Sequence, residues 1–209
     1  MSYSQLGQDL AVLDFYSDVP VGYYVDIGAY DGKTYSNTLL LEEKGWVGIC
    51  ADPLPSAYEK LCENRKFCYK TNKAVWHTSG EKLEFAAIEH DENSYDAMLS
   101  GITGHSTYKK EQDAAKKITV ETISLNDLLA VAAAPNFMDY LSIDTEGTEY
   151  EILAALDHHR YKFGLIDVEH NYDEEKRHAI RDLLESKGYA YLRENKWDDC
   201  YIHLSQKKA

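Results

Sequence analysis

Short runs of consecutive apolar residues alternate along the chain with stretches in which apolar residues recur every three or four positions. The first pattern is typical of strands buried in a parallel sheet, and the second is typical of amphipathic helices. The apolar runs predict strands at residues 23–27, 46–51, 66–69, 140–144 and 163–168. The helical spacing predicts helices at residues 34–44, 56–64, 125–131, 148–156 and 173–187.

The regular alternation of strands and helices predicts right-handed crossovers, and therefore a parallel sheet with helices on both faces. The last two predicted strands, 189–193 and 200–204, are joined by only a few residues, so they must be antiparallel. The expected fold is α/β, with a doubly wound, mostly parallel sheet and one antiparallel edge strand.

The middle of the chain departs from this alternation. Residues 81–87 and 118–122 alternate like strands of an antiparallel edge or of an insertion. The stretch 91–117 is polar and contains glycine, so we expect a lid or insertion there that is mobile until substrate binds. A plain surface excursion is the alternative. The length of 209 residues suits a single domain spanning residues 1–209.

The charge balance excludes one class of partner. The chain carries 22 basic and 36 acidic side chains, a formal net charge of -14. A field of this sign repels nucleic acid, so we expect no nucleic-acid partner.

No apolar run approaches the roughly 20 residues that span a bilayer, and the N-terminus lacks the basic and apolar regions of a signal peptide. We therefore expect a cytoplasmic protein without membrane insertion.

The cysteines fit the same compartment. Cys50, Cys62, Cys68 and Cys200 form no C-x-x-C pair, and free thiols in a reducing environment are the simpler interpretation. Cysteine and histidine residues show no zinc-ligand spacing, so we expect no structural zinc site.

The first predicted strand ends in a turn that contains glycine and two acids, and in an open α/β sheet ligands bind at such strand ends. A dinucleotide fingerprint requires glycine two places after Gly28, where this chain has Tyr30. Asp31 would also repel phosphate. The turn therefore favours a cofactor without a diphosphate, and Asp26 with Asp31 suits a positively charged one.

The second predicted strand ends in Asp52, at the position where a carboxylate can hold the ribose hydroxyls of a nucleotide. A ribose, a positive charge and the lack of a diphosphate together describe S-adenosylmethionine. The simpler alternatives are that Gly28 and Gly32 only shape a tight turn and that Asp52 caps a helix.

At these residues the chain resembles the FkbM-type methyltransferases, which use S-adenosylmethionine and often methylate hydroxyl oxygens, frequently on sugars. The resemblance covers nearly the whole chain, and its most specific element is Asp-x-Glu-Gly-x-Glu at residues 144–149. The other matching segments are residues 4–9, 25–32, 48–53, 72–75 and 166–170. Two positions depart from the family's pattern, because Asp52 replaces a common glutamate and Thr145 a common valine.

This resemblance implies a Rossmann-like class I methyltransferase fold and a set of cofactor-binding residues. The first turn would hold the methionine part of the cofactor through Asp26, Gly28, Tyr30 and Asp31. Asp52 would hold the ribose, and the adenine would be flanked by Asn72, Ala74 and Val75. Gln8 would reach over the site from an N-terminal segment; a polar residue on an exposed helix is the alternative for it.

Acidic and imidazole side chains follow the fourth and fifth predicted parallel strands. Asp144 ends one strand, and Glu169 with His170 ends the other. Adjacent strands lie about 4.8 Å apart, so these groups can converge. An alcohol needs a base or a metal ion to become a nucleophile at neutral pH.

Two catalytic alternatives stay open. Asp144, Glu169 and His170 bind Mg²⁺ or Mn²⁺, or else Asp144 or His170 serves as general base without a metal. For Glu169 and His170, capping of the following helix is a third interpretation. Glu146 and Glu149 lie in the next turn, where favourable charges at a helix N-terminus explain them as well as catalysis does.

We therefore expect an S-adenosylmethionine-dependent O-methyltransferase that acts on a sugar hydroxyl of a glycan or of an activated-sugar precursor. Its partner would be a carbohydrate or another hydroxyl-bearing small molecule. The alternatives are methylation of a non-sugar hydroxyl or of an amine, and a cofactor-binding module without catalysis.

Overall fold

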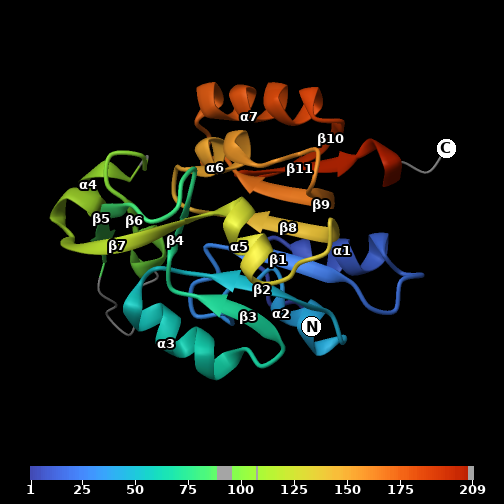
Figure 1. Cartoon of the computed structure of the whole chain (residues 1–209), viewed down its shortest axis with the longest axis horizontal. Coiled ribbons are helices and arrows are strands. Elements are labelled where there is room, and N and C mark those ends of the chain that lie inside the picture. The colour runs from blue at the N-terminus through green and yellow to red at the C-terminus, as the bar shows by residue number, and fades with distance from the viewer. Residues whose placement is uncertain (89–95, 107, 207–209) are drawn as a thin grey trace.

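Two sheets organise the computed structural model, which describes residues 1–88, 96–106 and 108–206 (Figure 1). The larger sheet has seven strands in the order β10-β11-β9-β8-β1-β2-β3. Three of them lie in the first half of the chain: β1 Tyr23–Ile27, β2 Val47–Ala51 and β3 Cys68–Thr71. The other four are β8 Phe137–Ile143, β9 Lys162–Glu169, β10 Tyr189–Asn195 and β11 Asp198–His203. Each strand predicted for the parallel sheet is present.

The strand directions confirm a doubly wound, mostly parallel α/β sheet. The strands β1, β2, β3, β8 and β9 pair in parallel. The last strand, β11, pairs antiparallel with both β9 and β10. The reversed strand therefore lies second from the edge and not at the edge as predicted, because β11 folds back from its turn with β10 into the place beside β9.

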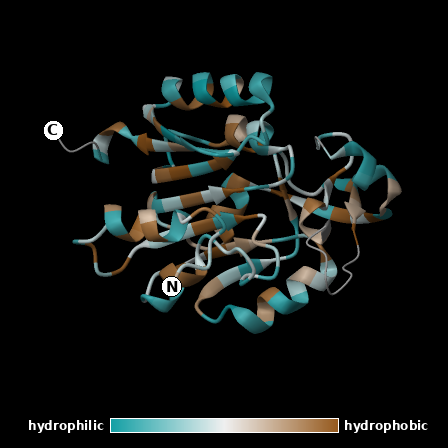
Figure 2. Ribbon diagram, turned by 180° about the vertical axis from the view of Figure 1, so that it is seen from behind, coloured by the Kyte–Doolittle hydropathy of each residue, from teal (hydrophilic) through white to brown (hydrophobic). Residues whose placement is uncertain are grey.

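Helices cover both faces of this sheet. One face packs against α1 Gln8–Phe15, α2 Leu39–Glu43 and α3 Pro55–Asn64. The other packs against α5 Leu125–Val131, α6 Glu149–Ala155 and α7 Glu174–Ser186. Tyr24 of β1 joins the first core and its neighbour Val25 joins the second, because strand side chains alternate between faces. Figure 2 shows apolar residues along the strands and mostly polar residues on α7.

Local signals explain where two of these helices begin. Ser124 caps α5, since its hydroxyl accepts the N–H of Asp127 at 3.1 Å. Ser56, the first residue of the helix predicted after β2, does not cap that helix. That helix, α3, begins at Pro55, and the N–H of Leu54 is donated to Asp52 Oδ1 at 2.9 Å.

The cysteines and the helix lengths can be compared directly with the predictions from composition. All four cysteines are free, and Cys50 and Cys200 are buried. Among the helices in the described ranges, none is long and apolar enough to cross a membrane.

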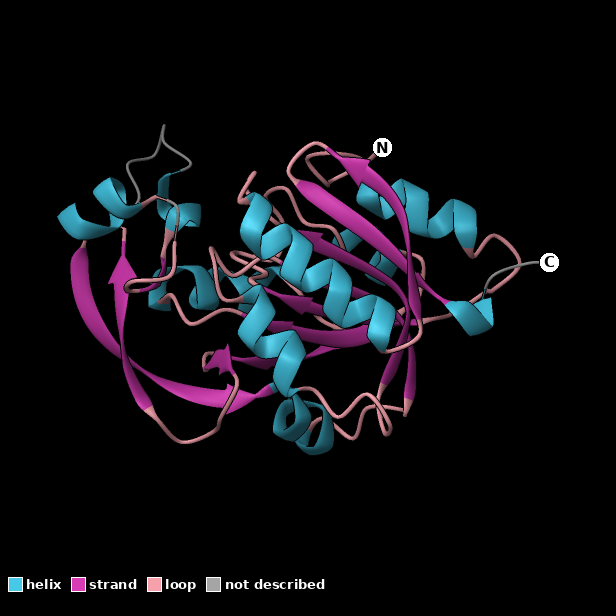
Figure 3. Cartoon of the chain, turned by 90° about the horizontal axis from the view of Figure 1, so that it is seen from above, coloured by secondary structure: helices cyan, strands magenta, loops and turns pink. Residues whose placement is uncertain are grey.

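A second sheet stands beside the carboxyl ends of the parallel strands (Figures 1 and 3). Its order is β4-β7-β5-β6, with the bounds β4 Ala74–Trp76, β5 Lys82–Ala87, β6 Gly101–Ile102 and β7 Lys116–Ser124. As predicted, β5 and β7 are antiparallel. This sheet and α3 share a third core that includes Leu54, Phe85 and Val120. The second sheet therefore forms a wall next to the strand ends where ligands bind.

The stretch 91–117 is more regular than its sequence predicts. It contains the 3-10 helix η1 Asp96–Leu99, the strand β6 and the helix α4 Lys109–Ala114; a further 3-10 helix, η2 Leu204–Gln206, follows β11. The two-residue strand β6 forms because it pairs with β5, a long-range contact without a local sequence signal. Residues 91–95 and 107 lie outside the described residues, and the mobility of this stretch stays a prediction.

Candidate active site

The ends of β1, β2 and β8 and the second sheet enclose a cavity of about 630 Å³. The strand ends contribute Gly28, Asp52 and Asp144, and the second sheet and η1 contribute Phe85 and Met98. The cavity therefore lies at the strand ends, where the sequence predicts a cofactor.

Asp52 lines this cavity and is buried, with 7% of its surface exposed. Its Oδ2 accepts the N–H of Tyr30 at 2.8 Å, and its Oδ1 accepts the N–H of Leu54 at 2.9 Å. Burial raises the pKa of Asp52 to about 7, although these two backbone bonds favour the charged form. Asp52 thus connects the glycine turn to Leu54, the residue before α3, and does not cap the helix as the simpler interpretation predicts. Each carboxylate oxygen still has a second lone pair for a ligand hydroxyl.

Four further predicted cofactor residues line the same cavity: Gly28, Tyr30, Ala74 and Val75. Gly28 has φ 85°, and a Cβ there would overlap the backbone carbonyl of Asp144. Glycine is therefore required at this position because the ends of β1 and β8 approach closely. Gly28 is thus needed for the packing of the two strand ends, and not to make room for a ligand.

Besides Gln8, three predicted cofactor residues lie outside the cavity lining. Asp26 faces the α1–α3 side of the sheet, where its Oδ2 accepts the hydroxyl of Thr38 at 2.5 Å. Asp31 holds its own turn, since Oδ1 accepts the N–H of Thr34 at 2.7 Å. Asn72 is exposed, and its neighbour Lys73 lines the cavity instead. Strand alternation explains Asp26, and local turn geometry explains the other two.

A second hollow of about 390 Å³ adjoins the first, and Met98 and Asp144 line both. Gln8 lies here and not in the larger cavity. It is buried, and its Nε2 donates to Asp198 Oδ2 at 2.6 Å. The alternative of an exposed helix residue is therefore wrong for Gln8. The described lining of this hollow is mostly polar: Gln5, Gln8, Tyr35, Asn37, Met98, Ser142, Ile143, Asp144, Asp167, Glu169, Trp197 and Asp198.

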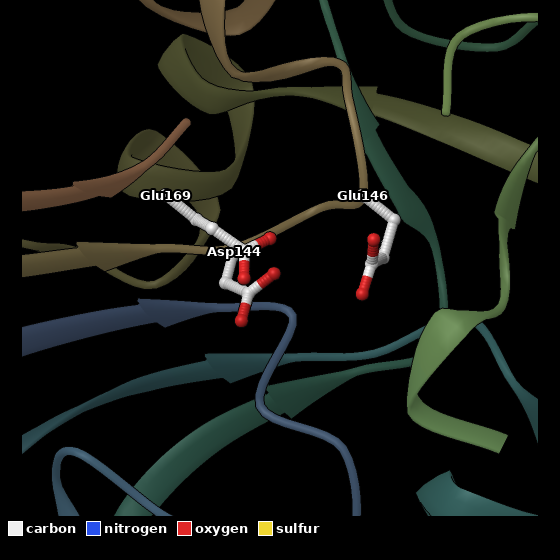
Figure 4. A group of neighbouring side chains, drawn as sticks. All are labelled: Asp144, Glu146 and Glu169. Carbon is white, nitrogen blue, oxygen red and sulfur yellow. The ribbon is translucent and has the colours of Figure 1, made fainter. Parts of the chain in front are cut away.

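Three carboxylates meet where these spaces join. Oxygens of Asp144, Glu146 and Glu169 all lie within 4.8 Å of one another. Asp144 and Glu169 come from the ends of β8 and β9, and Glu146 faces them from the loop that follows β8 (Figure 4). Residues 144–148 are called the carboxylate loop below. The predicted convergence of Asp144 and Glu169 is thus present in the structure.

The crowding of these acids changes their ionisation. Burial, aided by the nearby Glu149, raises the pKa of Asp144 to about 6. Burial and the charge of Asp144 raise the pKa of Glu146 to about 9 and the pKa of Glu169 well above its usual range. At neutral pH Asp144 is thus ionised, while Glu146 retains its proton.

Two residues outside the predicted site, Thr145 and Glu149, shape the carboxylate loop. Glu149 Oε1 accepts the N–H groups of Thr145 at 2.8 Å and of Gly147 at 3.0 Å. It also accepts the hydroxyl of Thr145 at 2.9 Å. Glu149 therefore has the structural role that a charge near a helix N-terminus predicts, and Thr145 contributes a bond that valine could not make.

His170 does not join the carboxylates, contrary to the prediction. Its Nδ1 accepts the N–H of Tyr172 at 3.1 Å, and its Nε2 lies 3.8 Å from Asp199 Oδ1. Burial lowers the pKa of this imidazole. The sharp turn after β9 is the reason, because Asn171 and Tyr172 have φ values of 47° and 58°. Among the described residues, the candidate metal-binding group is Asp144, Glu146 and Glu169.

Sequence reasoning did not assign Asn171 and Asp198 to the site. Asn171 Nδ2 donates to Glu169 Oε2 at 2.6 Å and to Glu146 Oε2 at 3.4 Å. Its position directly after the β9 strand end was the available signal. Asp198 lies at the start of β11, and burial with the charge of Asp144 raises its pKa to about 8. No local pattern marks Asp198.

Comparisons with known proteins show which family the chain belongs to. Residues 26–191 match the family model described as the methyltransferase FkbM domain. No curated protein matches the sequence significantly. A solved TehB-like SAM-dependent methyltransferase from Corynebacterium glutamicum shares 8% identity at a TM-score of 0.47, covering 94% of this chain and 86% of its own. Because the family match runs over most of the sequence, the chain belongs to the FkbM family of methyltransferases and has the predicted Rossmann-like class I fold.

Proposed function

We propose that this methyltransferase transfers the methyl group of S-adenosylmethionine to a hydroxyl oxygen of a sugar, in a glycan or in an activated-sugar precursor. The observation that carries the proposal is the junction of two hollows at Asp144. One hollow has a carboxylate and apolar side chains that suit a nucleoside, and the other is lined mostly by polar residues. A donor on one side and an acceptor on the other would then meet beside a carboxylate.

The residues of the larger cavity fit the cofactor that this family implies. S-adenosylmethionine supplies a methyl group that is activated by a positively charged sulfonium. Asp52 offers carboxylate oxygens for two ribose hydroxyls, and the apolar side chains of Ala74, Val75 and Phe85 suit the faces of an adenine. The acids at the junction suit the positive charge of the sulfonium.

The residues at the junction would activate the acceptor. In methyl transfer the attacking oxygen must be aligned with the methyl carbon and must lose its proton. Asp144 has a pKa of about 6, so it is ionised at neutral pH and can accept that proton. Asn171 would hold Glu169 in place through their 2.6 Å hydrogen bond.

A divalent ion is the second way to activate the acceptor, and we propose it as an alternative at the same place. Carboxylate oxygens of Asp144, Glu146 and Glu169 lie within 4.8 Å of one another, and Mg²⁺ and Mn²⁺ prefer such oxygen ligands. A dication would also offset the cost of crowding three acids. His170 has no part in this set.

The second hollow supports a carbohydrate acceptor. Its amide, hydroxyl and carboxyl groups can hydrogen-bond several sugar hydroxyls, and the rings of Tyr35 and Trp197 offer faces on which a sugar can stack. Asn37 Oδ1 is buried there without a hydrogen-bond partner among the described residues, so it can accept a bond from a ligand hydroxyl.

A radiolabel transfer screen tests this proposal. Protein and methyl-labelled S-adenosylmethionine are incubated with free, nucleotide-linked and lipid-linked sugars, with phenols and amines as the competing acceptor classes. Asp144→Asn should lose most of the transfer rate but keep its affinity for S-adenosylhomocysteine, and the exposed Asp182→Asn is the matched control. Loss of activity in EDTA, with recovery in Mg²⁺ or Mn²⁺, favours the metal; full activity in EDTA favours Asp144 as base.

Three outcomes would contradict the proposal at different levels. Transfer only to a phenol or an amine contradicts the sugar acceptor. Unchanged activity of Asp144→Asn places the chemistry elsewhere. Wild-type protein that fails to bind S-adenosylhomocysteine in calorimetry contradicts the placement of the cofactor.

A further inference from the structure

A segment that we call the capping segment, residues 97–106 and 108–115, covers the larger cavity. Ala97, Met98, Ser100 and Ile102 of this segment line the cavity opposite Gly28 and Asp52. A ligand in the cavity would therefore lie between the strand ends and the capping segment. How firmly this segment is held should decide how fast the ligand leaves.

The capping segment lies directly on the carboxylate loop. A Cβ at Gly101 would come within 3.2 Å of Glu146 Cβ, and a Cβ at Gly147 would overlap the carbonyl of His105. Further along, the hydroxyl of Tyr108 donates to Asn171 Oδ1 at 3.4 Å. The segment that covers the cofactor cavity and the loop that carries Glu146 thus share one contact surface.

Lys176 bridges the two at this surface. Its Nζ donates to the carbonyl of His105 at 3.0 Å and also to the carbonyl of Gly147. Its own backbone is fixed in the first turn of α7, because its N–H is donated to Asp173 Oδ1 at 3.1 Å. The helix is in turn tied to β11 through Arg177, whose Nε lies 2.8 Å from Asp199 Oδ2. The ammonium is therefore held on a rigid support.

We propose that Lys176 is a positioning residue that fastens the capping segment to the carboxylate loop and so retains the cofactor. One ammonium bonded to two carbonyls is a strong link, because hydrogen bonds with a charged partner are stronger than neutral ones. The bond to Gly147 also holds the loop from which Glu146 projects. The same side chain therefore holds the capping segment over the cavity and the loop that carries Glu146.

The test compares Lys176→Met, which keeps the length of the side chain and removes the ammonium, with Lys176→Arg, which keeps a cation. Lys187→Met at the other end of α7 is the matched control, since Lys187 is exposed. Stopped-flow fluorescence measures association and dissociation of S-adenosylhomocysteine. Lys176→Met should raise the dissociation rate about tenfold with little change in the association rate, and Lys176→Arg should recover most of the difference.

Hydrogen exchange of the protein without ligand gives a second measurement. Lys176→Met should lose protection in residues 99–106 and 108–115 and in residues 145–148, while the central strands β1 and β8 keep theirs. A general loss of protection would indicate a merely structural role and would overturn the proposal. If Lys176→Met does not fold, Lys176→Gln, which keeps a neutral donor, is measured in the same way.

The kinetic part of this inference rests on the proposed placement of the cofactor, but the exchange measurement does not. Failure of the wild-type protein to bind S-adenosylhomocysteine contradicts the proposed function, and the exchange pattern then still decides the role of Lys176. Unchanged dissociation together with unchanged local protection in Lys176→Met would overturn the inference while the proposed function stands.

Discussion

Replacing Arg65 by methionine should destabilise the protein strongly, because its guanidinium is buried beneath the first glycine turn. Arg65 Nε lies 2.9 Å from Glu42 Oε2, and the two side chains are only 0% and 5% exposed. Its two terminal nitrogens donate to the hydroxyls of Thr38 at 3.0 Å and Tyr24 at 2.8 Å. Methionine would fill part of the volume but would leave the buried charge of Glu42 without its cationic partner.

Two routes give the magnitude. Removing one partner of a buried ion pair costs about 3–5 kcal/mol. Independently, burial alone would raise the pKa of Glu42, but the hydrogen bond from Tyr24 and the charge of Arg65 outweigh it and lower the pKa from 4.5 to about 2. The two pKa values differ by about 2.5, and each pKa unit corresponds to about 1.4 kcal/mol. The difference therefore corresponds to roughly 3 kcal/mol of stabilisation at neutral pH. The second figure covers every group that stabilises the ionised Glu42, including Tyr24 and the N–H groups of Lys66 and Phe67. The loss expected for Arg65 alone is therefore about 3 kcal/mol, from the first route.

Urea unfolding followed by tryptophan fluorescence measures this loss, with exposed Lys60→Met on α3 as the control. The pKa of Glu42 is lowered in the folded state, so its stabilisation is complete above pH 4.5 and is lost as the pH falls toward 2. The wild-type protein should therefore lose stability across that interval, and Arg65→Met should show a flatter dependence on pH.

Two results would refute this reasoning. One is a decrease in the free energy of unfolding of less than about 1 kcal/mol for Arg65→Met at pH 7. The other comes from the double-mutant cycle with Glu42→Gln, if its coupling energy falls below about 0.5 kcal/mol, the value expected for independent sites.

Three further predictions concern the site. Asp52→Ala should weaken S-adenosylhomocysteine binding by about 3 kcal/mol or more, since each of two bonds to the carboxylate contributes about 1.5–3 kcal/mol; unchanged calorimetric affinity would count against Asp52. Gly28→Ala should lower the free energy of unfolding by about 2 kcal/mol or more, because the new Cβ overlaps the Asp144 carbonyl; an unchanged melting temperature would show that β1 and β8 can separate at no cost. His170→Ala should leave the transfer rate within about threefold of the wild type, and a larger loss in a folded variant would indicate that His170 takes part in catalysis.

The parallel strands could be predicted from sequence because a strand buried on both faces requires consecutive apolar residues. Their carboxyl ends then placed Asp52, Asp144 and Glu169 correctly, since these ends meet at one edge of the sheet. Short elements that depend on a partner strand were missed. Examples are β4 and β6, whose two or three residues carry no periodic pattern.

The sequence alone determined the parallel strands of the core, the family and the residues at the strand ends. Tertiary structure decided which side chains enter the site. The backbone turn after β9 directs His170 toward Asp199 and Asn171 toward the carboxylates, and strand alternation directs Asp26 to the far face of the sheet. Gln8 and Asp198 meet across a separation of 190 residues. Local patterns record burial and propensity, whereas the direction of a side chain depends on backbone angles and packing that only the complete fold sets.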